Sequence, residues 1–175
     1  GNEYQHKSPY DCWHTPKEEW INYFKSEGPL FEQCQAVCKE LDPARATMSV
    51  ICADPIDVYY HSGAGNIPDI MGFNIYSGWY GGGFSRMTWH VENLRKMFPD
   101  KPIFITEYGA GVDPRIHSNK PTRFDYSSEY GRMFHSAYIK MFKEMPYLLG
   151  TAVWNLNDFY SEWRIDAVPH VNNKG

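Results

Sequence analysis

The chain has 175 residues, a net charge of −4 and a charged fraction of 22%. This length suits one ordinary domain or a piece of a larger one, and the absence of any block of like charges argues against a nucleic-acid partner. The aromatic fraction of 17% exceeds what a disordered chain carries, and no apolar stretch approaches the roughly 20 residues of a membrane helix. We therefore expect a folded chain with neither a nucleic acid nor a membrane as its partner.

The predicted elements alternate between helices and strands. A T-x-x-E capping box that begins at Thr15, with Pro16 in the first helical position, predicts a helix over 15–24. Apolar residues at helical spacing predict a second helix over 30–41. A β-rich run over 47–52 predicts the first strand, and a polar loop follows it.

The second half of the chain continues the alternation. A buried strand is predicted over 69–76, a helix over 87–98, a strand over 102–106, a helix from about 127, and a last strand over 149–154 before a polar tail. Near-continuously apolar strands between helices favour a parallel sheet that helices cover, so the expected fold class is α/β. We expect a single domain over 1–175, without a linker.

The four cysteines and seven histidines carry no metal signature. Cys34 and Cys38 lie four residues apart on a predicted helix, and with Cys12 and Cys52 they are interpreted as ordinary buried or half-buried thiols. The sequence contains no H-E-x-x-H motif and no His pair beside the cysteines. We expect neither a metal nor a cofactor.

Polar and aromatic residues follow the predicted strands, at the ends where parallel α/β folds place their functional groups. These strand ends read Asn74-x-Tyr76, Thr106-Glu107-Tyr108 and Trp154-Asn155-x-x-Asp158. Directly after an apolar strand, Glu107 is placed to attack or protonate a substrate, although on position alone it equally suits a loop-bracing acid. On position alone Glu3 suits a solvated terminal residue, or the end of a preceding strand.

As a pair, the two glutamates favour glycoside hydrolysis. That reaction needs one carboxylic acid to protonate the leaving oxygen and one carboxylate to attack or stabilise the sugar carbon. Trp and Tyr offer flat apolar faces to sugar C–H groups, and Asn offers hydrogen bonds to hydroxyls. The sequence has no G-x-S-x-G motif, no phosphate-binding loop with Lys, and no G-x-G-x-x-G after a strand.

Six motifs follow one another along the chain: Gly1-Asn2-Glu3, Leu41-Asp42-Pro43, Phe73-Asn74-Ile75-Tyr76-Ser77-Gly78-Trp79-Tyr80, Ile105-Thr106-Glu107-Tyr108-Gly109-Ala110, Val153-Trp154-Asn155-Leu156-Asn157-Asp158-Phe159 and Asn172-Asn173-Lys174-Gly175. In this order they resemble glycoside hydrolase family 2, which includes β-galactosidases, β-glucuronidases and β-mannosidases. The resemblance implies the C-terminal half, about strands four to eight, of a (β/α)8 TIM-type barrel with outer helices. It also implies a retaining mechanism, with two carboxyl groups about 5–5.5 Å apart.

The resemblance assigns roles residue by residue. Glu107 would be the nucleophile and Glu3 the general acid/base. Asn2 would hold the sugar 2-hydroxyl, Tyr76 would hydrogen-bond the nucleophile, and Trp154 would form the floor of the pocket. The further substrate-binding candidates are Asn74, Trp79, Tyr80, Asn155, Asp158, Asn172 and Lys174. Of these, the Trp79 and Tyr80 pair could instead shape its loop, and Asp158 could instead brace the loop at Asn155.

The identity of the sugar depends on the chain end. Asn172-x-Lys174 resembles the motif with which β-glucuronidases meet the substrate carboxylate, and a Lys beside a carboxylate is physically sensible. A similar string ends the barrel in galactosidase-like members, however, and 167–170 offers no Arg to reinforce a carboxylate site. The sequence analysis therefore favours β-galactosidase, with β-glucuronidase as the alternative.

The length is short for a complete barrel of about 250 residues, so we expect a truncated chain. Its partners would be a β-linked oligosaccharide or glycoside substrate and either a second copy or the missing half of the barrel, which could cover unpaired strand edges. The alternative from another class is an inactive sugar-binding or structural fragment. The compartment stays open, with a bacterial periplasm or cytoplasm as the working expectation.

Overall fold

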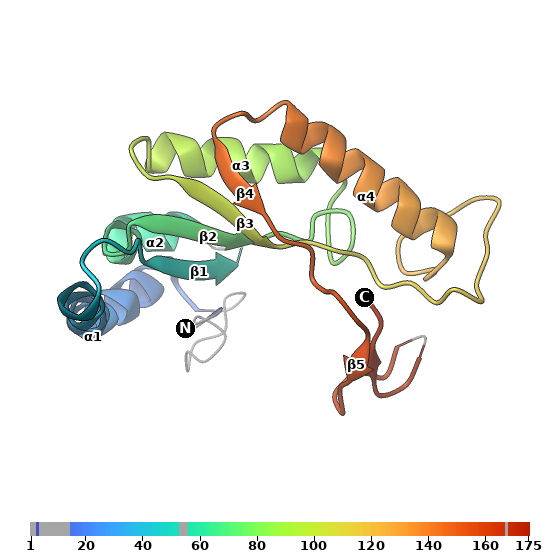
Figure 1. The fold of residues 1–175 in the computed structure, drawn as a ribbon, viewed down its shortest axis with the longest axis horizontal. Helices are drawn as coiled ribbons and strands as arrows, with labels where there is room; N and C mark the ends of the chain where they lie inside the picture. Colours follow the sequence, from blue (N-terminus) through green and yellow to red (C-terminus); the bar gives the residue numbers. More distant parts are fainter. Residues whose placement is uncertain (1–2, 4–14, 53–55, 167) are drawn as a thin grey trace. The chain divides into compact units, whose positions relative to one another are not determined.

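The computed structural model describes residues 3, 15–52, 56–166 and 168–175 (Figure 1). The chain divides into two compact units. Unit 1 comprises Gly1–Asn74 with Val91–Phe104, and unit 2 comprises Ile75–His90 with Ile105–Gly175. No helix of the described ranges combines the length and the apolar character that crossing a membrane would require.

Four short strands form one sheet, in the order β1-β2-β3-β4. Their bounds are Met48–Cys52 for β1, Ile70–Asn74 for β2, Ile103–Glu107 for β3 and Leu148–Thr151 for β4. The strands run parallel, and β1 pairs with β2 so that Cys52 lies opposite Asn74 at the carboxyl ends. The α/β class and the parallel sheet are confirmed, whereas membership of an eight-stranded barrel stays a prediction.

In unit 1, one continuous helix, α1 (Lys17–Leu41), replaces the two predicted helices. It includes Pro29, although proline removes one backbone donor from a helix interior. The prediction of a Thr15 cap is wrong, because Pro16 occupies the N-cap position and no side chain caps the helix. Buried Phe24 anchors the first half, with its ring 5.0 Å from that of Tyr59.

A second correction concerns the stretch after β1, which was predicted to be a polar loop. It contains helix α2 (Ile56–Ser62) and the 3-10 turn η2 (Ala64–Asn66). Gly63 separates them with a φ of 82°, a left-handed conformation that glycine adopts without steric cost. Ala64 and Gly65 of this turn are buried, and the Phe98 ring lies directly against Gly65. Two helical turns are too short to show a clear period in the sequence.

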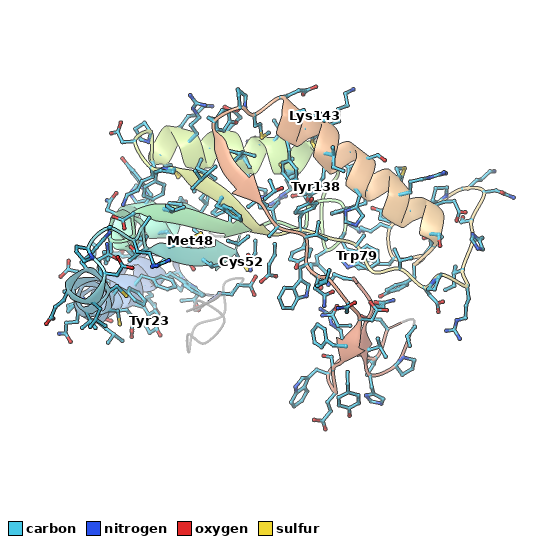
Figure 2. All side chains as sticks on the ribbon, in the orientation of Figure 1. Tyr23, Met48, Cys52, Trp79, Tyr138 and Lys143 are labelled. Atoms are coloured by element: carbon cyan, nitrogen blue, oxygen red, sulfur yellow. The ribbon has the colours of Figure 1, made fainter. Side chains whose placement is uncertain are left out.

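The cysteine prediction is also wrong for α1, where both Cys34 and Cys38 are exposed. The physical reason is that the apolar face of the second half of α1 is not covered by the described residues. Val37 is 53% exposed and Leu41 is 80% exposed. Cys52, which ends β1 and is labelled in Figure 2, is partly buried. The prediction for Cys12 lies outside the described residues.

Unit 2 is built around helix α4 (Ser128–Lys143), which begins where Ser127 accepts a hydrogen bond from the Tyr130 amide. Its buried face includes Phe134 and Tyr138, whose rings stack at 4.3 Å. The Tyr138 hydroxyl donates to the Ser77 carbonyl oxygen at 2.8 Å, so the helix fixes the loop that follows β2. Helix α3 (Ser85–Met97) is shared between the units.

The predicted polar tail also contains structure. Strands β5 (Phe159–Tyr160) and β6 (Val171–Asn172) form an antiparallel pair. Two-residue strands carry too little alternation to be recognised from sequence. The pair turns the chain back on itself. Just after β6, the Asn173 carbonyl oxygen accepts a 2.8 Å hydrogen bond from the Val112 amide.

Candidate active site

The carboxyl end of β3 places Glu107 beside Tyr76. Glu107 is the last residue of the strand, and its carbonyl oxygen accepts a 2.9 Å hydrogen bond from the Ile75 amide. The Tyr76 hydroxyl donates to Oε2 of Glu107 at 2.7 Å. Both side chains are half-buried. The two predicted residues therefore form a direct pair, in which the phenol favours the ionised carboxylate.

A buried lysine lies over the same two tyrosines. Lys174 is 6% exposed, and its ammonium lies 5.1 Å from the ring centre of Tyr76 and 4.8 Å from that of Tyr80. It donates to the Tyr80 hydroxyl oxygen at 2.6 Å. Burial lowers the pKa of Lys174, against smaller opposing effects of Tyr80 and of the Glu107 charge. An anion brought beside this ammonium would accept a charge-assisted hydrogen bond from it.

A second cation reaches the same phenol, and the sequence analysis missed it. The Arg164 guanidinium donates to the Tyr80 hydroxyl oxygen at 2.9 Å and lies 3.5 Å from the Asp166 carboxylate. No motif in the sequence pointed to Arg164, which lies outside 167–170, the stretch expected to supply such an arginine. The antiparallel pairing of β5 with β6 brings the loop that contains Arg164 to Tyr80. A second cation, itself paired with Asp166, therefore reaches the hydroxyl that Lys174 contacts.

Beside Tyr80 lies an aromatic-walled pocket of about 530 Å³, lined by Trp79, Tyr80, Phe124, Tyr126, Arg164 and Asp166. Trp79 is only 2% exposed, with Phe124 and Tyr126 rings 4.8 and 5.2 Å away. Trp79 therefore packs inside its own loop, whereas the side chain of its neighbour Tyr80 is 48% exposed. Burial, with Asp166 as the next cause, raises the pKa of Tyr126 to about 12, so the Tyr126 phenol keeps its proton at neutral pH.

The segment after β4 packs closely against the segment after β3. The Trp154 amide donates to the Tyr108 carbonyl oxygen at 2.9 Å, and a Cβ at Gly109 would collide with the Trp154 carbonyl oxygen. The Trp154–Asn155 peptide bond is cis. The Asp158 carboxylate accepts a 2.8 Å hydrogen bond from the Gly175 amide, so in this structure Asp158 braces the end of the chain.

Three buried amide groups near this segment have side-chain atoms without a hydrogen-bond partner among the described residues. The atoms are Oδ1 of Asn155, Oδ1 of Asn172 and Nδ2 of Asn173. The side-chain Nδ2 of Asn155 donates to the Asn157 carbonyl oxygen at 2.7 Å. The backbone amide of Asn155 donates to the Lys174 carbonyl oxygen at 3.1 Å. Buried amide atoms normally find partners, so polar atoms without one are suited to a hydroxylated ligand.

Unit 1 carries the other predicted carboxylate. Oε1 of Glu3 accepts hydrogen bonds from Nδ2 of Asn74 at 2.8 Å and from Sγ of Cys52 at 2.9 Å. The Glu3 amide donates to the Val50 carbonyl oxygen at 3.1 Å. Asn74, predicted to bind substrate, therefore contacts the predicted acid/base. Asn2 lies outside the described residues.

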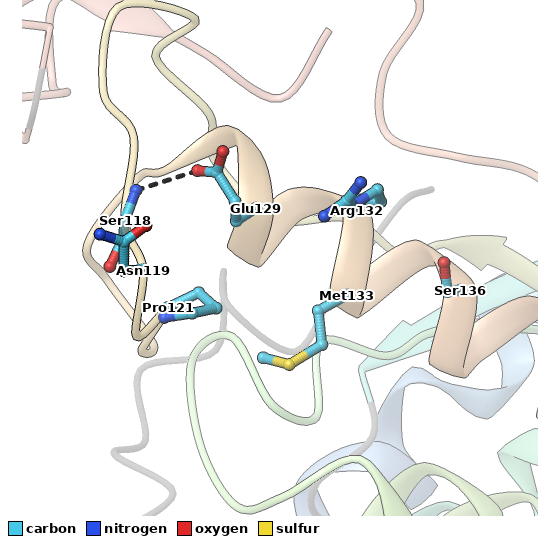
Figure 3. Close-up of a pocket in the computed structure, with 7 residues that line it drawn as sticks. All are labelled: Ser118, Asn119, Pro121, Glu129, Arg132, Met133 and Ser136. Carbon is cyan, nitrogen blue, oxygen red and sulfur yellow. Dashed lines mark hydrogen bonds between the residues drawn. The ribbon is translucent and has the colours of Figure 1, made fainter.

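A second hollow of about 430 Å³ lies between the loop 118–121 and the start of α4 (Figure 3). Its carboxylate, Glu129, contacts Nδ1 of His117 at 3.0 Å and accepts a hydrogen bond from the Ser118 amide at 3.0 Å. The His117 contact first, and the Ser118 amide second, lower the pKa of Glu129 to about 2. None of the predicted site residues lines it. Within the described ranges, no three His, Cys, Asp or Glu side chains gather as a metal site would require.

The chain is similar in sequence and in structure to known β-glucuronidases. It is 32% identical over 155 residues to a β-glucuronidase of Streptococcus agalactiae, covering 83% of the chain and 24% of that protein, and 28% identical to one of Bacteroides fragilis, covering 82% and 21%. A solved Bacteroides uniformis β-glucuronidase 2, covalently bound to cyclophellitol-6-carboxylate aziridine, matches with 35% identity and a TM-score of 0.80, over 84% of this chain and 17% of that one. No family model matches the sequence.

These similarities, with the motifs, identify the chain as a glycoside hydrolase family 2-like protein. The curated relatives it matches carry the name β-glucuronidase, whereas a putative β-galactosidase of Bacteroides fragilis matches in structure with 27% identity and a TM-score of 0.70. The sequence-based preference for β-galactosidase is therefore less well supported than its β-glucuronidase alternative. The chain spans about a quarter of the length of these curated relatives.

Proposed function

We propose that the protein carrying this chain is a retaining β-glucuronidase that removes terminal glucuronic acid from β-glycosides. The observation that carries the proposal is the buried Lys174 ammonium above Tyr76, the tyrosine that hydrogen-bonds Glu107. A cation kept away from water favours a ligand with an anionic group. The C6 carboxylate distinguishes glucuronides from galactosides.

Arg164 and the relatives support the same choice of sugar. Two cations donate to a single Tyr80 hydroxyl oxygen, at 2.6 and 2.9 Å. Bringing a substrate carboxylate to this point would relieve the mutual repulsion of the two positive charges. A neutral galactoside would leave the Lys174 ammonium without such compensation, whereas Arg164 keeps the Asp166 carboxylate at 3.5 Å. The names of the matched curated relatives agree with this physical argument.

In the proposed mechanism, Glu107 attacks the anomeric carbon while Glu3 protonates the departing oxygen, giving a covalent glycosyl–Glu107 intermediate. Glu3 then removes a proton from water, which hydrolyses that intermediate with overall retention. Tyr76 keeps Glu107 ionised and oriented through its 2.7 Å hydrogen bond. The amides of Asn2 and Asn172 would bind sugar hydroxyls, and Trp154 would lie under the ring.

The proposed architecture is the C-terminal half of a (β/α)8 barrel, in which the ends of the parallel strands face one catalytic mouth. Support comes from the position of the candidate residues. Glu107 ends β3, Asn74 ends β2, and Tyr76 follows two residues later. A complete barrel would require the two carboxyl groups to lie about 5–5.5 Å apart for retention.

A panel of nitrophenyl β-glycosides tests the proposed function on the full-length protein. We expect turnover of the glucuronide at least about 100-fold faster than that of the galactoside, judged by kcat/KM. Faster galactoside turnover would favour the β-galactosidase reading. Binding of glucuronic acid without turnover of any glycoside would favour a sugar-binding protein.

A further inference from the structure

Two donors from neighbouring strands converge on a single oxygen of Glu3. Cys52 ends β1 and Asn74 ends β2, and these two residues are register partners in the parallel sheet. Register partners present their side chains on the same face of a sheet. Sγ of Cys52 and Nδ2 of Asn74 thereby reach the same atom, Oε1 of Glu3, at 2.9 and 2.8 Å.

The backbone of Glu3 is fixed independently of its side chain. Its amide donates to the Val50 carbonyl oxygen in β1, two residues before Cys52. Its φ is 47°, a left-handed conformation that a non-glycine residue adopts only where the surroundings impose it. One strand thus holds both the main chain and the carboxylate of Glu3, through Val50 and Cys52 respectively.

We propose that Cys52 is a positioning residue for general acid/base catalysis by Glu3. A proton on Oε1 would point at the donors from Cys52 and Asn74, so these two hydrogen bonds assign the transferable proton to Oε2. Cys52 thereby sets which oxygen faces the leaving group, although the thiol itself touches no reacting atom. The inference rests on the proposed acid/base role of Glu3 and adds to it a residue that no sequence motif indicated.

The expected signature depends on the leaving group. A poor leaving group, such as an alkyl alcohol, needs the proton from Glu3, whereas a dinitrophenolate departs without it. Loss of the Cys52 hydrogen bond should therefore slow the cleavage of alkyl glucuronides and spare that of dinitrophenyl glucuronides. A purely structural role would slow both reactions equally.

The test compares Cys52→Ala and Cys52→Val, which lack the donor, with Cys52→Ser, which retains one, in the full-length protein. We expect kcat/KM for an alkyl glucuronide to fall about tenfold in the first two variants and by less than about threefold in Cys52→Ser. With the dinitrophenyl glucuronide, all three should stay within about twofold of the wild type. The matched control is Cys38→Ala, at an exposed thiol, which should change neither rate.

A Glu3→Ala background separates failure of this inference from failure of the proposed function. If Glu3 is the acid/base, Glu3→Ala alone removes alkyl glucuronide cleavage, and adding Cys52→Ala should not slow dinitrophenyl glucuronide cleavage further. Equal losses on both substrates, or no loss with either donor-free variant, would overturn the role of Cys52. Normal alkyl glucuronide cleavage by Glu3→Ala would instead overturn the proposed acid/base.

Discussion

The Tyr76 hydroxyl donates a 2.7 Å hydrogen bond to Oε2 of Glu107, so the carboxylate at the end of β3 is held by a residue that follows β2. The same strand ends are joined through the backbone by the Ile75 amide and the Glu107 carbonyl oxygen. The pair is thus a consequence of strand adjacency rather than of proximity in sequence. In the proposed mechanism it keeps the nucleophile charged and correctly aimed.

Removing this hydrogen bond should slow the formation of the covalent intermediate. Tyr76→Phe keeps the ring beneath Lys174 and removes only the donor to Glu107. We expect kcat/KM for nitrophenyl glucuronide to fall about 10–100-fold, because hydrogen bonds to charged groups contribute more than neutral ones. Steady-state kinetics with a thermal unfolding control would measure it. Wild-type kinetics in this variant would remove Tyr76 from the site.

Neutralising the buried lysine should change specificity more than it changes activity. Lys174→Gln should lower kcat/KM for nitrophenyl glucuronide about 100-fold and leave that for the neutral glucoside or galactoside within about threefold. Lys143→Gln, at the exposed end of α4 (Figure 2), is the matched control and should change neither. An equal loss on charged and neutral sugars would contradict carboxylate recognition by Lys174.

The lowered pKa of Lys174 predicts how binding depends on pH. Burial favours the neutral amine, so this side chain loses its proton at a lower pH than an exposed lysine would. A carboxylate ligand binds the charged form, so its dissociation constant should rise as the pH climbs through that lowered pKa, and binding there should take up protons. Calorimetry with glucuronic acid, which carries the C6 carboxylate, and the Glu107→Gln protein, between about pH 7 and pH 10, measures both. A dissociation constant that stays level over this range, or one that falls, would contradict the assignment.

The close approach of two loops at Gly109 predicts a position that does not tolerate a side chain. A Cβ there would collide with the Trp154 carbonyl oxygen, which belongs to backbone and cannot swing away. Gly109→Ala should lower the free energy of unfolding by about 1–3 kcal/mol and displace the segment that follows β4. Chemical denaturation measures the first effect. Gly83→Ala, at a position where a Cβ would meet nothing within 4 Å, is the control.

The sequence predicted the sheet well because its strands are continuous apolar runs, such as 102–106, whose type does not depend on distant contacts. It predicted poorly where tertiary packing decides. The capping box and the apolar spacing predicted two helices where α1 is continuous through Pro29, and α2 was hidden because its short buried face has no visible period. Arg164 was missed because the antiparallel β5–β6 pair, not sequence distance, brings it to Tyr80.

In the candidate site too, sequence patterns indicated some residues and missed others. Glu107 was indicated by its position directly after an apolar strand, whereas Tyr76 and Lys174 were indicated by the family 2 motifs, and the roles of all three stay predictions. Cys52 was interpreted as an ordinary thiol, since a single cysteine at the end of a strand carries no pattern. Its contact with Glu3 follows only from the register of β1 against β2, which no residue type reveals.

Covalent trapping tests the central claim most directly. The full-length protein would be incubated with a deoxyfluoro-glucuronyl fluoride, which forms the glycosyl intermediate and hydrolyses slowly, and the labelled peptide would be mapped by mass spectrometry. We expect one adduct, on Glu107, that is absent from Glu107→Gln. An adduct on a different residue, or continued turnover of nitrophenyl glucuronide by Glu107→Gln, would contradict the role of Glu107 as the nucleophile.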